Sequence, residues 1–399
     1  MNYRTRHKTL RWSQAVTGIW AFLILELTGC TDPYLPEAAQ KPPSMLVIDG
    51  FINPSGVSTV KLSRTLALAA SSAAPPETKA VASIEEEGGT RYALRESRAG
   101  TYASAALTLN PAKRYRLHLN TAAGQEYASD FVPVKITPPI DAITWKFENS
   151  EFRVLVSAHD DAKNTHYYRW DYDETWETRP AYSTGLEYTN HALRGRFVPF
   201  PTVCWGTDVA KTVQIANTTA FGQDVVSEHR LRVLPANTER LFTRYSILVR
   251  QYALTKEEHA YWDLLRKNTE SIGSLFDAQP VQLTGNVRCL SHANVVVLGF
   301  VGVHSVAEKR IFIARADLPT GTDVLSGYEK CIPPEFVDLY PDNGQTPEEI
   351  LEITLGKFEF LPVEEGRNIL TGRTGIFVAR PECLDCRLRG TAAKPSFWP

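Results

Sequence analysis

The sequence predicts a mainly β protein with two β-sandwich domains of immunoglobulin-like size, the second containing an inserted α-helix near residues 255–268. Three observations support this prediction. Short runs of alternating apolar and polar residues recur along the chain, turn-forming residues separate them, and one stretch combines a helix-capping signal with helical spacing. The 370 residues after position 29 exceed what one core usually organises, so two domains are expected.

The first domain is expected over residues 45–137, where strand-like runs follow one another closely. Residues 115–120 alternate apolar and polar side chains, as a half-buried strand does. A turn at 122–125 then leads into a further strand at 126–134. Five to seven such strands within about 90 residues are typical of an immunoglobulin-like sandwich.

The second domain is expected over residues 138–399, after the Pro-Pro pair at 138–139. Thr255 and Glu258 form a capping box that predicts the start of a helix, and apolar residues then recur at helical spacing. A second capping box begins at Thr346. The strands expected around these helices are 143–147, 152–158, 167–172, 209–216, 295–303 and 310–314.

The N-terminus has the pattern of a lipoprotein signal peptide, expected over residues 1–29. Four Lys or Arg residues precede an apolar run over 15–27, which is too short to span a bilayer and fits a secretory signal. The Leu-Thr-Gly-Cys sequence at 27–30 resembles a lipobox, so Cys30 is the expected lipidation site, carrying palmitate-type acyl chains. The proline-bearing stretch 30–44 is expected to be a lipidated tether. A plain signal peptide with a chance cysteine is the alternative.

The charge of the chain excludes one class of partner. Residues 1–29 carry four Lys or Arg and one Glu, so their removal changes the net charge from −2 to −5. Nucleic-acid binding needs a basic patch, so no nucleic-acid partner is expected. No apolar run after residue 30 is long enough to span a membrane, so the outer membrane is expected to hold the protein through its lipid anchor.

Five cysteines follow Cys30, and in an exported protein they are expected to form up to two disulfides and leave one thiol. The candidates are Cys204, Cys331, Cys383 and Cys386. We expect Cys383 or Cys386 to bond to a distant cysteine, Cys331 before the others, and so to hold the apolar C-terminal tail in place. A zinc or redox site at the Cys-x-x-Cys pair is the alternative, although no second pair and no thioredoxin-like pattern accompany it.

The richest aromatic stretch is 167–176. Exposed aromatic rings stack on sugars and bases, so Trp170, Tyr172 and Trp176 are a possible ligand platform. In a strand, however, Tyr168, Trp170 and Tyr172 share one face, and a tryptophan there usually belongs to a sandwich core. The core interpretation is favoured, and the platform remains the alternative.

Signals for metal binding and catalysis are weak. The sequence has no Gly-x-Ser-x-Gly elbow, no His-Glu-x-x-His and no phosphate-binding loop, although paired carboxylates would leave no local motif. Acidic residues in a loop are normally just solvated. We therefore expect no metal, no other cofactor and no enzyme activity. The residues that could serve as metal ligands are His159, Asp160, Asp161, His166, Asp171 and Asp173.

Several segments resemble one known family: 46–50, 62–65, 244–262, 267–280, 285–287, 383–387 and 394–398. Together they are similar to the Bacteroidota lipoprotein family catalogued as domain of unknown function 4249, over essentially the whole mature chain. Two departures stand out, since the family commonly has Gly-Gly where this chain has Arg389-Gly390, and Cys289 is an extra cysteine. The resemblance implies a surface lipoprotein encoded beside a TonB-dependent outer-membrane receptor.

The expected function is that of a surface-exposed outer-membrane lipoprotein, a non-catalytic binding or accessory module that works with a TonB-dependent receptor in ligand uptake. The ligand is left open. One alternative is a hydrolase acting on surface glycans or peptides, which turnover of such a library would favour. The other is a structural subunit of an envelope assembly, which receptor binding without any small ligand would favour.

Overall fold

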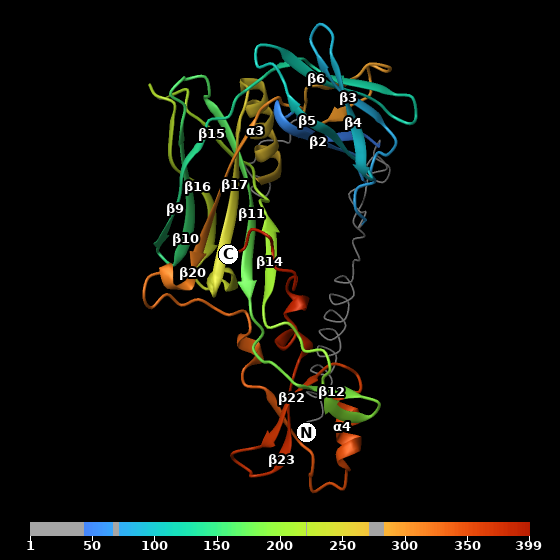
Figure 1. Ribbon diagram of the computed structural model, residues 1–399, viewed down its shortest axis with the longest axis vertical. Helices are drawn as coiled ribbons and strands as arrows, with labels where there is room; N and C mark the ends of the chain where they lie inside the picture. The colour runs from blue at the N-terminus through green and yellow to red at the C-terminus, as the bar shows by residue number, and fades with distance from the viewer. Residues whose placement is uncertain (1–43, 67–71, 221, 271–282) are drawn as a thin grey trace, which may run out of the picture.

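The computed structural model describes residues 44–66, 72–220, 222–270 and 283–399, and within them the protein is mainly β, as predicted. Figure 1 shows a barrel-like sheet and a pair of facing sheets toward one end of the long axis, and a small unit at the opposite end. No helix in the described ranges is long and apolar enough to cross a membrane. The expected signal peptide 1–29 and Cys30 lie outside the described residues.

The first part, here called the barrel, is one ten-stranded sheet in the order β18-β7-β6-β3-β4-β5-β2-β1-β19, with β8 beside β6. The end strands β18 and β19 contact each other, so the sheet is nearly closed around an apolar core that includes Ile84, Tyr102 and Leu117. Near-closure leaves little free strand edge for unwanted pairing. The strands are β1 (Leu46–Phe51), β2 (Ser55–Arg64), β3 (Val81–Glu86), β4 (Arg91–Arg98), β5 (Thr101–Thr108), β6 (Arg114–Asn120), β7 (Glu126–Ser129), β8 (Val132–Pro133), β18 (Val287–Cys289) and β19 (Val297–Leu298).

The barrel differs from the sandwich predicted for residues 45–137. It is a single curved sheet with one core, whereas a sandwich has two facing sheets. Two of its strands also come from much later in the chain: β18 pairs with β7, and β19 lies parallel to β1. The boundary expected at residue 138 therefore separates strands that share one core. The run expected at 295–303 contributes only the two-residue strand β19.

The second part, here called the sandwich, has two sheets that face each other across a second apolar core. One sheet has the order β16-β10-β9, and the other has the order β14-β11-β17-β20 with β15 beside β11. Phe152 and Val154 of the first sheet share this core with Trp170 and Ile247 of the second. The strands are β9 (Ile140–Glu148), β10 (Glu151–His159), β11 (Tyr167–Thr178), β14 (Cys204–Val209), β15 (Gln214–Asn217), β16 (Val225–Pro235), β17 (Arg244–Ala253) and β20 (Val306–Ala314).

Helix α3 (Lys256–Glu270) occupies the stretch where a helix was predicted, and it lies between the barrel and the sandwich (Figure 1). Thr255 caps it, because its hydroxyl accepts a hydrogen bond from the backbone N–H of Glu258 at 3.1 Å. Beside the helix, Phe51 of the barrel stacks on His304, and Tyr252 of the sandwich packs edge-on against both rings. Aromatic packing thus fills the junction between the two parts.

The third part, here called the distal unit, comprises residues 181–200 and 328–384 and has two small sheets, β21-β23-β22 and β12-β13. Helix α4 (Pro347–Leu355) begins at the predicted capping box, in which Thr346 and Glu349 each accept the other's backbone N–H. Its strands are β12 (Leu186–Thr189), β13 (Ala192–Gly195), β21 (Glu335–Asp338), β22 (Leu361–Arg367) and β23 (Thr374–Ala379). Short 3-10 helices along the chain are η1 (Glu239–Leu241), η2 (Arg315–Asp317), η3 (Glu329–Cys331), η4 (Pro381–Cys383) and η5 (Cys386–Leu388).

Two disulfides connect the end of the chain to distant elements. Cys331 bonds to Cys383 within the distal unit, and Cys204, the first residue of β14, bonds to Cys386. Cys289 is a free thiol buried in the barrel. Because both tail cysteines are bonded to distant partners, the Cys-x-x-Cys pair does not present a dithiol for zinc or redox chemistry.

The tail then continues onto the sandwich. Thr391 forms a backbone bridge with Trp205 of β14. Trp398 is buried and packs edge-on against Trp205 and Phe312, while the guanidinium of Arg310 lies 3.6 Å from the ring centre of Phe397. Burial of Trp398 and the contact of Arg310 with Phe397 hold the end of the chain against the five-stranded sheet.

Candidate functional site

Two hollows lie along β16 at the edge of the sandwich. The larger has a volume of about 940 Å³ and is lined by residues of β9, β10, β11, β15 and β16. The smaller has about 610 Å³ and is lined by β15 and the first half of β16. His229 lines both, so we treat them together as the β16 groove. β16 pairs with β10 along one edge, and within the described ranges no strand pairs with its other edge. The groove therefore follows an unpaired strand edge.

The larger hollow carries four basic and three acidic side chains. Most of them are paired: Lys146 lies 2.6 Å from Glu228, and Arg153 lies 2.8 Å from Glu151. Arg230 is exposed and forms no ion pair with any described residue. The groove thus offers one free guanidinium, a group suited to bind the oxygen atoms of a polar ligand in a planar, two-pronged geometry.

His229 stands where the two hollows meet. Its ring stacks on the buried ring of Trp170, with 4.8 Å between ring centres. Burial lowers the pKa of His229, and the neighbouring charge of Arg230 lowers it further, so the ring is neutral at neutral pH. Its Nε2 atom has no hydrogen-bond partner among the described residues. This nitrogen is itself buried, so the His229 ring contributes its stacked face to the wall between the two hollows.

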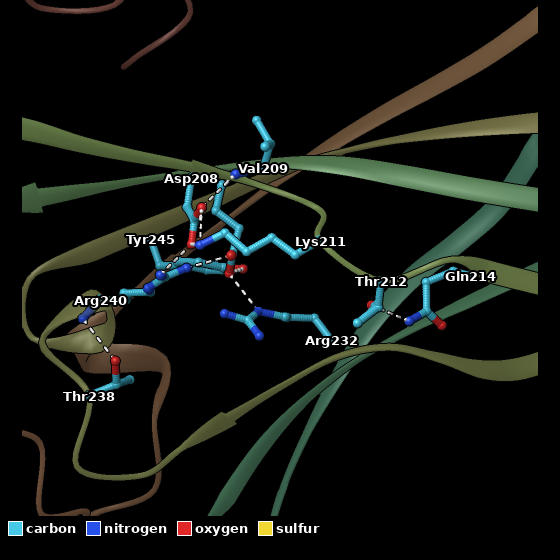
Figure 2. A network of polar contacts seen from close by, with 10 residues as sticks. Asp208, Val209, Lys211, Thr212, Gln214, Arg232, Thr238, Arg240 and Tyr245 are labelled. Carbon is cyan, nitrogen blue, oxygen red and sulfur yellow. Dashed lines mark hydrogen bonds and ion pairs between the residues drawn. The ribbon is translucent and has the colours of Figure 1, made fainter. Parts of the chain in front are cut away.

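An ionic network adjoins the groove through Arg232 (Figure 2). The carboxylate of Glu174, which is 1% exposed, accepts hydrogen bonds from Arg232 at 3.1 Å, from the hydroxyl of Tyr245 at 2.7 Å and from Arg240. Arg240 also donates to Asp208 at 2.7 Å. Because Arg232 lines the groove, the network holds one of the groove's side chains in a fixed position.

The network is a set of fixed charges. The hydrogen bond from Arg240 lowers the pKa of Asp208 to about 2, and a contact with Lys211 contributes in the same direction. Burial raises the pKa of Tyr245 well above its ordinary value, and the nearby carboxylate of Glu174 adds to this. Neither Asp208 nor Tyr245 therefore exchanges a proton near neutral pH, and the arrangement is suited to positioning side chains.

The predicted ligand platform belongs to the sandwich core. Trp170, Tyr172 and Trp176 are 1%, 4% and 8% exposed, because alternate residues of β11 face the opposite sheet. A stacking platform needs accessible ring faces, so the platform interpretation is wrong for these residues. Only Tyr172 among the three reaches the wall of the larger hollow.

The metal ligands considered from the sequence do not come together. His159 lies 2.7 Å from Asp141, and the guanidinium of Arg250 binds both Asp171 and Asp173. Among the described residues no three His, Cys, Asp or Glu side chains are grouped so as to hold a metal ion. The remaining candidates lie in the loop between β10 and β11: Asp160, Asp161 and His166.

Sequence reasoning missed the groove and most of the network, because their residues come from seven strands and the 3-10 helix η1, which are spread along the sequence. Glu174 is the member that the sequence could have indicated. It lies on the same face of β11 as Tyr172 and Trp176, and a carboxylate in an apolar stripe must find a buried partner. The alternation alone could not show that Arg232, Arg240 and Tyr245 supply that partner.

The fold and the groove first define a class: a mainly β protein whose sandwich carries a charged groove, with a barrel on one side and a disulfide-bonded distal unit beyond. More specifically, the chain belongs to the family described as Domain of unknown function (DUF4249), whose model matches residues 31–310. The match ends before the tail, so the tail segments that resembled the family lie outside the matched residues.

Comparison with characterised proteins adds little. No curated protein matches the chain. Among solved structures, the chitinase ChiA74 from Bacillus thuringiensis is similar in part, with 10% sequence identity and a TM-score of 0.15. The alignment covers 49% of this chain and 29% of the chitinase, so this chain spans less than a third of that protein's length.

Proposed function

We propose that the protein is a surface-exposed outer-membrane lipoprotein, anchored through Cys30, that serves as a non-catalytic binding and accessory module for a TonB-dependent receptor in ligand uptake. The observation that carries the proposal is the β16 groove, an open charged surface on a rigid sandwich. The two disulfides are consistent with export, because such bonds persist in oxidising compartments.

In this proposal the groove binds a polar ligand through charged side chains that are held in fixed positions. Arg230 supplies a free guanidinium, and Arg232 is held by Glu174 beside it. The neutral ring of His229, stacked on Trp170, forms the wall between the two hollows. The groove would hold a polar ligand or a polar segment of the receptor, and the barrel would serve as the scaffold between the anchor and the sandwich.

Co-purification from native outer membranes tests the receptor part of the proposal. Tagged protein extracted in mild detergent should bring down an outer-membrane receptor that mass spectrometry identifies. Arg230→Glu should reduce the recovered receptor at least fivefold, because it reverses the free charge of the groove. Arg95→Glu, the same change at an exposed position on the barrel, should leave recovery unchanged. Equal recovery by both variants would exclude the groove as the contact.

The anchor is tested separately. Cys30→Ala should abolish incorporation of labelled palmitate and release the protein from the membrane or stall it as a precursor. A variant that still carries the label would show that Cys30 is not the lipidation site.

Two alternative functions have tests of their own. Turnover of a glycan or peptide library by the purified protein would favour a hydrolase, and receptor binding without any small ligand would favour a structural subunit.

A further inference from the structure

The distal unit contains a hollow of its own. Its lining comes from the β12–β13 hairpin, helix α4 and the start of β22, which lie together at one end of the molecule (Figure 1). Its volume is about 640 Å³, within the usual range of small-molecule sites, and it shares no residue with the β16 groove. Its wall combines a carboxylate, a hydroxyl, an imidazole and one strongly exposed aromatic ring, which belong to Glu352, Tyr188, His191 and Phe358.

The polar groups of this hollow are fixed by contacts with one another. Oε2 of Glu352 accepts a hydrogen bond from the hydroxyl of Tyr188 at 2.7 Å and lies 2.8 Å from Nδ1 of His191. These contacts lower the pKa of Glu352, while burial and the carboxylate raise the pKa of Tyr188 to about 12. Oε1 of Glu352, Nε2 of His191 and the side chain of Asn190 have no hydrogen-bond partner among the described residues. Both acceptor and donor positions thus remain for a ligand.

Phe358 is presented to solvent by an unusual backbone. The residue is 68% exposed, and its φ angle is +57°, in the left-handed region that glycine favours and bulky residues rarely adopt. Its N–H donates to the carbonyl of Leu355 at 3.1 Å, which fixes the turn after α4. Backbone strain of this kind collects at sites that clamp a ligand.

We propose that this hollow binds a neutral carbohydrate, with the ring of Phe358 against one face of a sugar and with Glu352, His191 and Asn190 bonding to its hydroxyl groups. Sugar hydroxyls both donate and accept hydrogen bonds, and the hollow offers both kinds of group. An anion would meet the ionised carboxylate of Glu352, and Arg196, the guanidinium in the lining, already lies 3.7 Å from Glu187 and 4.0 Å from the ring centre of Phe200. A quaternary ammonium ion would need acceptors and a cage of several rings, whereas a single strongly exposed ring lines this hollow.

Titration of the full mature chain with maltose, cellobiose, lactose and mannobiose, followed by saturation-transfer NMR and calorimetry, tests the proposal. At least one disaccharide should bind with a dissociation constant on the order of 1 mM or lower. Phe358→Ala should weaken binding at least tenfold, and Phe358→Gly should do the same without loss of folding because glycine accepts the backbone angle. Glu352→Gln should also weaken binding. Leu370→Ala, which removes an exposed apolar side chain outside the hollow, is the matched control.

Three results would overturn the proposal: no binding of any of the four sugars, binding that survives both Phe358 variants, or binding of tetramethylammonium in place of sugar. The Arg230→Glu variant should bind sugar as the unaltered chain does. Sugar binding and receptor recovery therefore fail independently, which separates this inference from the proposed function.

Discussion

Two buried glutamates, one in the barrel and one in the sandwich, show how differently these regions use charge. The side chain of Glu85 is 6% exposed, yet it neighbours the core residue Ile84 on β3 and so faces away from the barrel core. Its partners Arg91 and Arg116 lie at 2.9 and 2.7 Å and are themselves partly exposed. Glu174, by contrast, faces the sandwich core itself.

The difference shows where the molecule needs exact polar geometry. The barrel core is mainly apolar: the buried polar groups on its inner face include the serine hydroxyls of Ser58 and Ser129, while the buried carboxylate of Glu85 faces outward. A core of this kind suits a scaffold. In the sandwich, removing a carboxylate from water must be offset by several hydrogen bonds, and the fold supplies them from Arg232, Arg240 and Tyr245. Arg232 joins this ionic network to the wall of the β16 groove, so the region that carries buried charge is also the region to which we assign binding.

The largest expected effect comes from breaking the network. Glu174→Ala should lower the free energy of unfolding by about 3–5 kcal/mol, because it leaves Arg232 and Arg240 in a partly buried site without their shared partner. Urea denaturation measures it. Tyr245→Phe, which removes one hydrogen bond and keeps the charges, should cost only about 1 kcal/mol. Equal losses for both variants would mean that the charge pairing contributes nothing.

The second effect concerns the disulfide between β14 and the tail, Cys204–Cys386. Replacing Cys204 and Cys386 together by alanine should cost about 2–4 kcal/mol, mainly by freeing the unfolded chain. Hydrogen exchange should rise at β14 and at the tail around Trp398 and remain unchanged in the barrel strands. Cys289→Ala, which removes a buried thiol that forms no disulfide, is the control. Faster exchange in the barrel would show that the two regions are not independent.

These elements also show what the sequence could and could not predict. Helix α3 and the start of α4 were predicted correctly because capping boxes and helical spacing are local. Barrel closure was missed because β18 pairs with β7, more than 150 residues away. Five cysteines allow fifteen arrangements of two disulfides, so only the structure could choose the two that form.

For the candidate site the same limit holds. The side chains of β11 alternate between the core and the outer face, and this alternation is the signal from which the sequence predicted that Trp170 is buried in the core. The groove depends on how β16 lies beside β15, and no local pattern encodes the contact between two strands of different sheets. The exposure of Phe358 depends on its positive φ angle, and a phenylalanine in the sequence gives no reason to expect a positive φ angle.

The third effect should be smaller and comes from the barrel. Glu85→Ala should lower the free energy of unfolding by about 1–2 kcal/mol, because Arg91 and Arg116 can turn to water once the carboxylate is gone. Comparison with Glu174→Ala under the same denaturant conditions measures the contrast directly. A loss for Glu85→Ala as large as that for Glu174→Ala would remove the distinction between an outward and a core-facing buried charge.

The smallest effect is a pH dependence carried by Asp208. Its folded-state pKa of about 2 lies below the ordinary value of 3.8, so its contribution to stability is fully present above about pH 4 and is lost as the pH falls toward 2. With allowance for solvent screening, that contribution is about 1 kcal/mol. Asp208→Asn should therefore be less stable than the unaltered chain at pH 7, and the gap should close between pH 4 and pH 2. Asp323→Asn, at an exposed carboxylate, should show no such closing gap. A gap that stays constant with pH would mean that the Arg240 contact does not depend on the charge of Asp208.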